Sequence, residues 1–205
     1  MENFVENLSD LDLNKRYSYA DYLTWKFYQR TELHDGKLIV LDNTGTWHQT
    51  VFGKLMFILH DYFKPKNLIL IQAPFDVRIL NQSKFIPDNE VFTVVQPDFS
   101  VFDDDEKLDE NGGIDAPVLV VEILSPLSNN YQNELFDKFD IYEKAGVKEY
   151  WIIAPQQKLI MIFTLKKAFF VGLEPIKEDG IIQSVLFPDL KIKASELLID
   201  LDFLK

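Results

Sequence analysis

The 205-residue sequence contains no cysteine. This absence excludes disulfide bonds, thiolate metal sites and cysteine nucleophiles together. No run of 18 apolar residues occurs either, so the sequence predicts no transmembrane helix. Residues 1–16 are polar and acidic, which differs from the basic and then apolar pattern of a secretory signal. From these absences we expect a soluble, cytoplasmic protein that does not bind a membrane.

Positive charge is scarce as well. Lysine and arginine number 21 against 33 aspartates and glutamates, which gives a net charge of −12. Most nucleic-acid-binding domains are basic, so this balance argues against simple nucleic-acid binding. Net charge is an average, however, and a divalent cation in an acidic site can reverse the potential where a substrate binds.

Several familiar motifs are missing from the sequence: the P-loop, GxGxxG and GxSxG. The acidic run 103–106 lacks the glycine and the spaced glutamate of an EF-hand, so it is interpreted as a solvated loop. His48 and His60 lie twelve residues apart on one predicted helix, which is not a metal-ligand spacing, and they are interpreted as packing or capping residues. His34 lies beside a predicted turn.

Hydrophobic residues make up 47% of the sequence, enough for one well-buried core, and we expect a single domain over residues 1–205 with 1–16 as a loose or docking terminal segment. Hydrophobic periodicity predicts an α/β fold. The expected elements are helices at 18–29, 46–63, 131–145 and 194–198, strands on both sides of Asp35-Gly36, and further strands at 67–80, 94–102, 117–124, 149–154, 158–165, 168–174 and 181–187.

Glu122 interrupts the apolar run PVLVVEIL, which is typical of a central strand covered on both faces. A carboxylate in such a place requires a cation or a hydrogen-bonded partner, because burying an unpaired charge is costly. Two other interpretations stay open from the sequence. Glu122 could reach solvent at the end of the strand, or it could form a structural ion pair with a lysine.

Asp98 follows Pro97 at the start of a predicted strand, with Ser100 and Phe102 on the same face. Alone, it is typical of a turn or a strand start. This strand is expected to pair beside the strand that carries Glu122. Two carboxylates that converge from adjacent strands form a hard-oxygen site suited to Mg²⁺ or Mn²⁺.

Lys138 lies on the helix predicted at 131–145, at the edge of its apolar stripe. One interpretation is a surface ion pair with Glu134, four residues earlier, which contributes only a few tenths of a kcal/mol. In the other, the ammonium group lies beside the two carboxylates. There it would orient an attacking water or stabilise charge on a phosphoryl transition state.

The segments PDFSVF, APVLVVEILSP, the ExxxK of the following helix and YEKAGVKEYWI together resemble the Uma-two family, which is grouped with restriction endonucleases in the PD-(D/E)xK nuclease superfamily. SYADYL, TELHDGKL and WHQ further upstream are similar to the N-terminal elements of that family, so the resemblance covers about residues 17–200. It implies a restriction-endonuclease-like fold, with a mixed central β-sheet flanked by α-helices, and with additional C-terminal strands expected here.

By position, the resemblance implies that Asp98 and Glu122 hold the metal. The superfamily lysine usually lies two residues after the glutamate, where this sequence has Leu124; Lys138 on the following helix matches the relocated lysine, with Glu134 before it. Glu32 in TELHDG matches a family glutamate and is a candidate additional metal ligand. The implied activity is hydrolysis of DNA phosphodiester bonds by an endonuclease dependent on Mg²⁺ or Mn²⁺.

Two alternatives belong to other classes of function. The net charge of −12 and the interrupted ExK pattern favour a non-catalytic module that acts as a homodimer on a nuclease-like scaffold. The same site could also hydrolyse a phosphate ester other than DNA.

Overall fold

The structure is a computed structural model that describes residues 4–42, 44–79, 86–125 and 131–198, with the backbone alone over 131–134. Its largest sheet is mixed, with β9 and β10 parallel and the other neighbouring strands antiparallel. In spatial order the six strands are β12 (Phe169–Gly172), β11 (Leu159–Lys166), β10 (Glu149–Ala154), β9 (Leu119–Ile123), β6 (Phe99–Phe102) and β3 (Ile69–Gln72).

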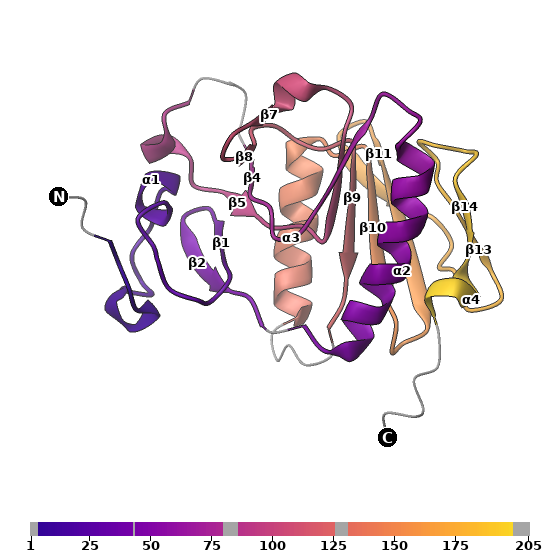
Figure 1. The fold of residues 1–205 in the computed structure, drawn as a ribbon, viewed down its shortest axis with the longest axis horizontal. Coiled ribbons are helices and arrows are strands. Elements are labelled where there is room, and N and C mark those ends of the chain that lie inside the picture. Colours follow the sequence, from indigo (N-terminus) through magenta and orange to yellow (C-terminus); the bar gives the residue numbers. More distant parts are fainter. Residues whose placement is uncertain (1–3, 43, 80–85, 126–130, 199–205) are drawn as a thin grey trace.

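A second six-stranded sheet is built from shorter strands nearer the N-terminus, seen on the left and at the top of Figure 1. Its order is β2 (Lys37–Val40), β1 (Thr31–His34), β5 (Val94–Val95), β4 (Val77–Arg78), β8 (Gly112–Gly113) and β7 (Leu108–Asp109). A separate pair near the C-terminus consists of β13 (Ile181–Gln183) and β14 (Lys191–Lys193).

The α-helices of the described chain are α1 (Tyr19–Tyr22), α2 (Thr46–Phe63), α3 (Tyr131–Ala145) and α4 (Ala194–Leu197), and the 3₁₀-helices are η1 (Leu8–Asp10), η2 (Asp88–Glu90) and η3 (Asp105–Lys107). The two long helices lie on opposite sides of the large sheet (Figure 1). This arrangement confirms the predicted mixed central sheet flanked by helices, with additional C-terminal strands.

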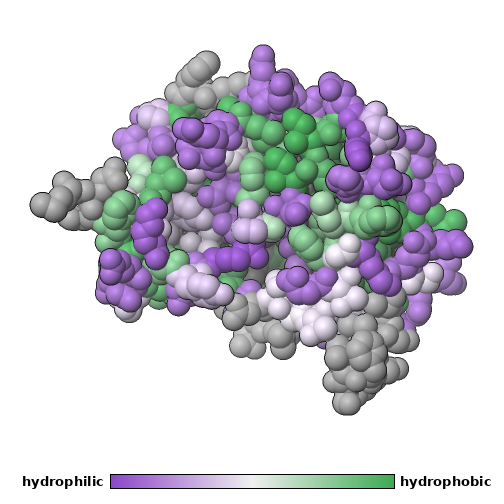
Figure 2. All heavy atoms as spheres, in the orientation of Figure 1, coloured by the Kyte–Doolittle hydropathy of each residue, from purple (hydrophilic) through white to green (hydrophobic). Residues whose placement is uncertain are grey.

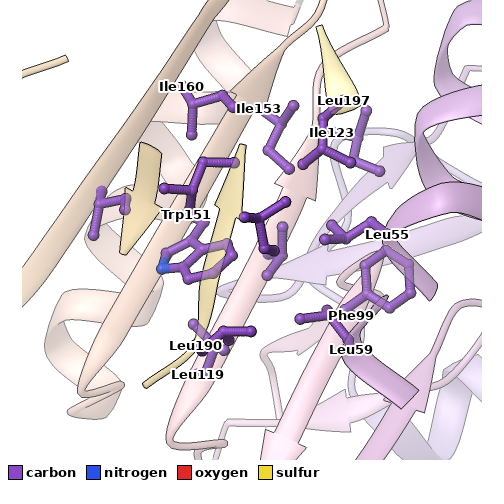
Figure 3. Close-up of a cluster of buried hydrophobic side chains, with 14 of the residues drawn as sticks. Leu55, Leu59, Phe99, Leu119, Ile123, Trp151, Ile153, Ile160, Leu190 and Leu197 are labelled. Atoms are coloured by element: carbon purple, nitrogen blue, oxygen red, sulfur yellow. The ribbon is translucent and has the colours of Figure 1, made fainter. Parts of the chain in front are cut away.

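Each long helix buries one apolar face against the sheet. On one side, Leu55 and Leu59 of α2 pack in a cluster with Phe99 of β6 and Trp151 of β10, as Figure 3 shows. On the other side, Tyr142 of α3 packs against β9 and β10. β9 and β10 are buried along their whole length, as their largely apolar sequences predict for central strands.

The N-terminal helix is much shorter than predicted. Ser18 and Asp21 form a capping box at its start, yet the helix ends at Tyr22 instead of continuing to residue 29. Beyond it, Trp25 forms an isolated β-bridge with Val5: the N–H of Val5 donates to the carbonyl of Thr24, and the N–H of Lys26 donates to the carbonyl of Val5. Tertiary pairing has overridden the local helical pattern.

Three predicted strands also differ from the structure. The run 94–102 divides at residues 96–98 into β5 of the second sheet and β6 of the large sheet, so Asp98 directly precedes β6. The run 67–80 divides at Pro74 into β3, at the edge of the large sheet, and β4, which belongs to the second sheet. The strand expected at 181–187 ends at Gln183. The helices at 46–63 and 131–145 and the turn at Asp35-Gly36 are confirmed, with both turn residues at positive φ.

The face of the molecule in Figure 2 carries hydrophilic side chains around most of its outline, and hydrophobic side chains gather between them towards the centre and the upper part. Within the described ranges, every helix is too short or too polar to cross a membrane.

Candidate active site

Pairing of β6 with β9 brings Asp98 and Glu122 to the same place in the fold. Phe99 lies opposite Val121 in this antiparallel pair, so extending the register by one residue places Asp98 opposite Glu122. The backbone N–H of Ile123 donates a hydrogen bond of 2.7 Å to Asp98 Oδ2. Both carboxylates are buried, with 6% and 9% of their surface exposed, and both line one pocket.

Lys138 reaches Glu122 from the helix that directly follows β9. Its Nζ lies 2.9 Å from Glu122 Oε1, and one helical turn later the hydroxyl of Tyr142 donates to the same oxygen at 2.7 Å. Lys138 is only 8% exposed, so the alternative of a surface lysine is wrong. The side chain of Glu134, its suggested surface partner, lies outside the described residues.

Glu32 of β1 is the second carboxylate on Lys138, at 2.9 Å through its Oε1. The same oxygen accepts a hydrogen bond of 2.7 Å from the backbone N–H of Gln96, and Oε2 lies 2.9 Å from His34 Nε2. Glu32 is fully buried and does not line the pocket. Its position is that of a residue that holds Lys138 in place, and a role as a metal ligand stays a prediction.

The two carboxylates on Lys138 differ in their electrostatic environment. Burial alone would raise the pKa of Glu32, but Lys138 and the hydrogen bond from His34 lower it to about 2. Burial raises the pKa of Glu122 to about 7; Lys138 opposes this change, whereas the charges of Asp98 and Glu32 add to it. Glu122 is therefore the carboxylate whose negative charge the protein leaves least compensated.

The ammonium group of Lys138 stays charged. Burial would lower its pKa, but the two glutamates outweigh burial and raise it above the usual lysine value. The carboxylates of Glu122 and Glu32 thus flank one ammonium group, and the buried carboxylate of Asp98 lies opposite Glu122. When all three carboxylates are ionised, the four side chains carry an excess of two negative charges.

His48 is a site residue that its spacing did not reveal. It is the third residue of α2, is 4% exposed, and its Nε2 lies 3.1 and 3.0 Å from the two oxygens of Asp98. Because a carboxylate only accepts hydrogen bonds, Nε2 carries the proton. The interpretation of His48 as a packing or capping residue is thus corrected. The two residues of this contact are 50 positions apart in the sequence. The one sequence feature that pointed to His48 was the WHQ segment, which resembles a family element.

Two hydroxyl groups at the pocket have no hydrogen-bond partner among the described residues, those of Tyr150 and Ser125. Buried hydroxyl groups are nearly always hydrogen-bonded, to protein or to ordered water. These groups would therefore suit a water molecule or a substrate oxygen placed beside the carboxylates.

The tyrosine hydroxyls offer a matched stability test. Tyr150→Phe removes a buried hydroxyl without a described protein partner, so we expect the free energy of unfolding to change by less than about 1 kcal/mol. Tyr142→Phe removes the donor to Glu122 and should lower it by about 1–3 kcal/mol. Urea denaturation measures both variants, and equal destabilisation by the two would contradict this description of the pocket.

The side chains of the pocket offer few ligands to a divalent cation. The described part of the chain contains no group of three or more His, Cys, Asp or Glu side chains arranged to hold a metal ion. Mg²⁺, however, is usually held by one or two carboxylates and completes its octahedron with water and phosphate oxygens. Asp98 and Glu122, with the excess negative charge and the unpartnered hydroxyls beside them, fit a cation held in that manner.

Comparison with known proteins identifies the family. Residues 19–195 match the model of the Uma2 family, whose description is "Putative restriction endonuclease". The chain belongs to the Uma2 family. The match includes Asp98, strand β9 with Glu122 and helix α3 with Lys138. A search of curated proteins found no match to this Uma2 protein.

A solved structure, described as that of "a putative nuclease" from Anabaena variabilis, has a similar fold. It matches with a TM-score of 0.68 and 18% sequence identity, and the alignment covers 88% of this Uma2 chain and 97% of the other. At this level of identity the likeness establishes a shared nuclease-like fold, and the chemistry has to be argued from the site itself.

Proposed function

We propose that this Uma2 protein is an endodeoxyribonuclease that uses Mg²⁺ or Mn²⁺ to hydrolyse DNA phosphodiester bonds. One observation carries the proposal: Asp98 and Glu122 meet at adjacent strands in one pocket, and Lys138 lies 2.9 Å from Glu122. Membership of a family described by nuclease activity supports the choice of substrate class.

In this proposal Asp98 and Glu122 hold the cation. A divalent cation so held polarises a phosphate group and lowers the pKa of a water molecule towards neutrality. Lys138 remains protonated because of its two glutamates, so it acts as a fixed positive charge and not as a proton acceptor. It would orient the attacking water or stabilise the charge that develops on the phosphate.

Two further residues position this machinery. His48 holds Asp98 through both carboxylate oxygens, and Glu32 holds Lys138 from the side away from the pocket. Glu32, with partners on both of its oxygens, restricts Lys138 to one place. In this proposal the lysine comes from α3, and Leu124, which directly follows β9, stands two residues after Glu122, where the superfamily that the sequence resembles usually carries its lysine.

Cleavage of supercoiled plasmid DNA tests the proposal. With Mn²⁺ or Mg²⁺ we expect nicked or linear product from the wild type, none after addition of EDTA, and strongly reduced product from Glu122→Ala. Glu110→Ala, which alters an exposed glutamate, is the matched control and should cleave like the wild type. Equal activity of wild type and Glu122→Ala would contradict the site, and no cleavage by any variant would favour the non-catalytic module.

His48 gives a second test, which does not depend on DNA. We expect His48→Gln to weaken Mn²⁺ binding by about 10- to 100-fold, the usual effect of removing a partner that orients a metal ligand. His60→Gln, on the same helix but exposed, should leave the Kd unchanged. Calorimetric titration measures both, and unchanged Mn²⁺ binding by His48→Gln would contradict the positioning role.

A further inference from the structure

Arg30 lies immediately before β1 and lines the same pocket as Asp98 and Glu122. Its side chain is half-buried, and its backbone carbonyl accepts a hydrogen bond of 2.9 Å from the N–H of Leu41. Within the described ranges, no carboxylate lies at ion-pair distance from its guanidinium group. In a chain with 33 acidic and 21 basic side chains, a pocket-lining arginine without an acidic partner is unusual.

Gln96 fixes the orientation of this guanidinium group. Arg30 Nε donates to Gln96 Oε1 at 3.0 Å. The amide of Gln96 cannot turn around, because its Nε2 donates to the carboxylate of Asp76 at 2.8 Å and to the hydroxyl of Tyr22 at 3.1 Å. A carboxylate only accepts, so the amide nitrogen must face Asp76 and the amide oxygen must face Arg30. One N–H of the guanidinium group is thereby used, and the two terminal Nη groups remain.

The backbone around Gln96 also positions two of the carboxylates of the site. The N–H of Gln96 donates to Glu32, and Asp98 lies two residues further along the chain. Through Gln96, the guanidinium group of Arg30 is therefore held at a fixed position relative to Glu32 and Asp98. Without such a group, the carboxylates of the pocket would repel the phosphates of an approaching substrate.

We propose that Arg30 contacts the substrate directly and binds a phosphate oxygen of the DNA backbone through its Nη groups; this inference rests on the proposed function. The guanidinium group is permanently charged and planar, and its N–H groups match two oxygens of one phosphate. Gln96 and Asp76 serve as positioning residues for it. A lysine at position 30 would keep the charge but lose the paired geometry.

Binding of a 5′-fluorescein-labelled 14-base-pair DNA duplex tests this role. Fluorescence anisotropy is measured with Ca²⁺ in place of Mg²⁺ so that hydrolysis is slow, for the wild type, Arg30→Gln, Arg30→Lys and Arg16→Gln. Arg16→Gln removes the same charge at an exposed site, where Arg16 pairs with Asp35, and it is the control for a general electrostatic effect. Thermal unfolding checks that each variant is folded.

We expect Arg30→Gln to raise the Kd by about 10- to 100-fold, the effect of losing a charge-assisted hydrogen bond. Arg30→Lys should fall between the wild type and Arg30→Gln, and Arg16→Gln should stay within about twofold of the wild type. In cleavage assays with Mn²⁺, KM should rise more than kcat falls, because the contact already exists in the bound ground state.

A Kd for Arg30→Gln equal to that of Arg16→Gln, or no binding by the wild type, would overturn the inference. Its failure is distinguishable from failure of the proposed function, since that function is judged by cleavage in wild type and Glu122→Ala. A protein that cleaves DNA without needing Arg30 contradicts this inference alone. A protein that binds DNA through Arg30 but does not cleave it contradicts the nuclease proposal alone.

Discussion

Glu122→Gln should abolish most metal-dependent DNA cleavage while making the metal-free protein more stable. The loss of activity, about 10²- to 10³-fold or more, follows from removing one of two proposed cation ligands. The gain in stability follows from the excess of buried negative charge, since the raised pKa of Glu122 means that ionising this side chain opposes folding. A glutamine keeps the shape and can still accept from Lys138 and Tyr142.

The gain in stability of Glu122→Gln should depend on pH. The folded pKa of Glu122, about 7, lies above that of an ordinary glutamate, so its ionisation destabilises the fold at pH 8 and no longer does so near pH 4.5. We expect Glu122→Gln to exceed the wild type by about 2–3 kcal/mol in unfolding free energy at pH 8 in EDTA. This difference should shrink as the pH is lowered from 8 to 5.

Adding Mn²⁺ should reverse the order of stability. A ligand that binds only the folded state stabilises it by mass action, so the wild type should gain stability with Mn²⁺ and Glu122→Gln should gain little. Chemical denaturation with and without Mn²⁺ measures both effects. A variant that is less stable than the wild type in EDTA at pH 8 would show that Glu122 is a structural ion-pair partner of Lys138.

Lys138→Met should cause the largest loss of stability among these variants. The substitution leaves Glu32 and Glu122 buried without their shared cation, and breaking a buried ion pair from one side typically costs about 3–5 kcal/mol. Lys144→Met, on the same helix but exposed and paired with Asp140, should change the unfolding free energy by less than about 0.5 kcal/mol. Urea denaturation at pH 7.5 measures both variants.

A double variant separates the loss of the charge pair from the loss of packing. Glu32→Gln combined with Lys138→Met removes one of the two carboxylates that Lys138→Met leaves without a cation. The double variant should therefore lose less unfolding free energy than the sum of the losses in the two single variants. Additive effects would mean that Lys138 and Glu32 do not depend on each other. Activity should stay low in the double variant, because the positive charge beside Glu122 is still missing.

Much of the site could be predicted because its residues interrupt local patterns. Glu122 stands in an apolar strand and Lys138 stands at the edge of an apolar helical stripe, and both interruptions are visible within ten residues of sequence. The pairing of their neighbours then brings Asp98 opposite Glu122. The lysine and the glutamate meet as predicted at 2.9 Å, while their catalytic roles remain proposals.

Other contacts of the site could not be predicted, because they join segments that are far apart in the sequence. His48 meets Asp98 across 50 residues, and its own helix gives no hint of that partner. Glu32 reaches Lys138 from β1 of the second sheet, which is more than 100 residues from Lys138 in the sequence. Helix α1 ends early for a similar reason, since Val5 pairs with the backbone beyond it. In each case the structure depends on a contact between distant segments, which the pattern of neighbouring residues does not reveal.

Calorimetric titration with Mn²⁺ tests most directly whether Asp98 and Glu122 hold a cation. The wild type should bind Mn²⁺ at one site, and Asp98→Asn and Glu122→Gln should each abolish measurable binding, while the control Glu110→Ala retains it. Binding of Mn²⁺ that is unchanged in both Asp98→Asn and Glu122→Gln would contradict the proposed site, and so would the absence of binding by the folded wild type.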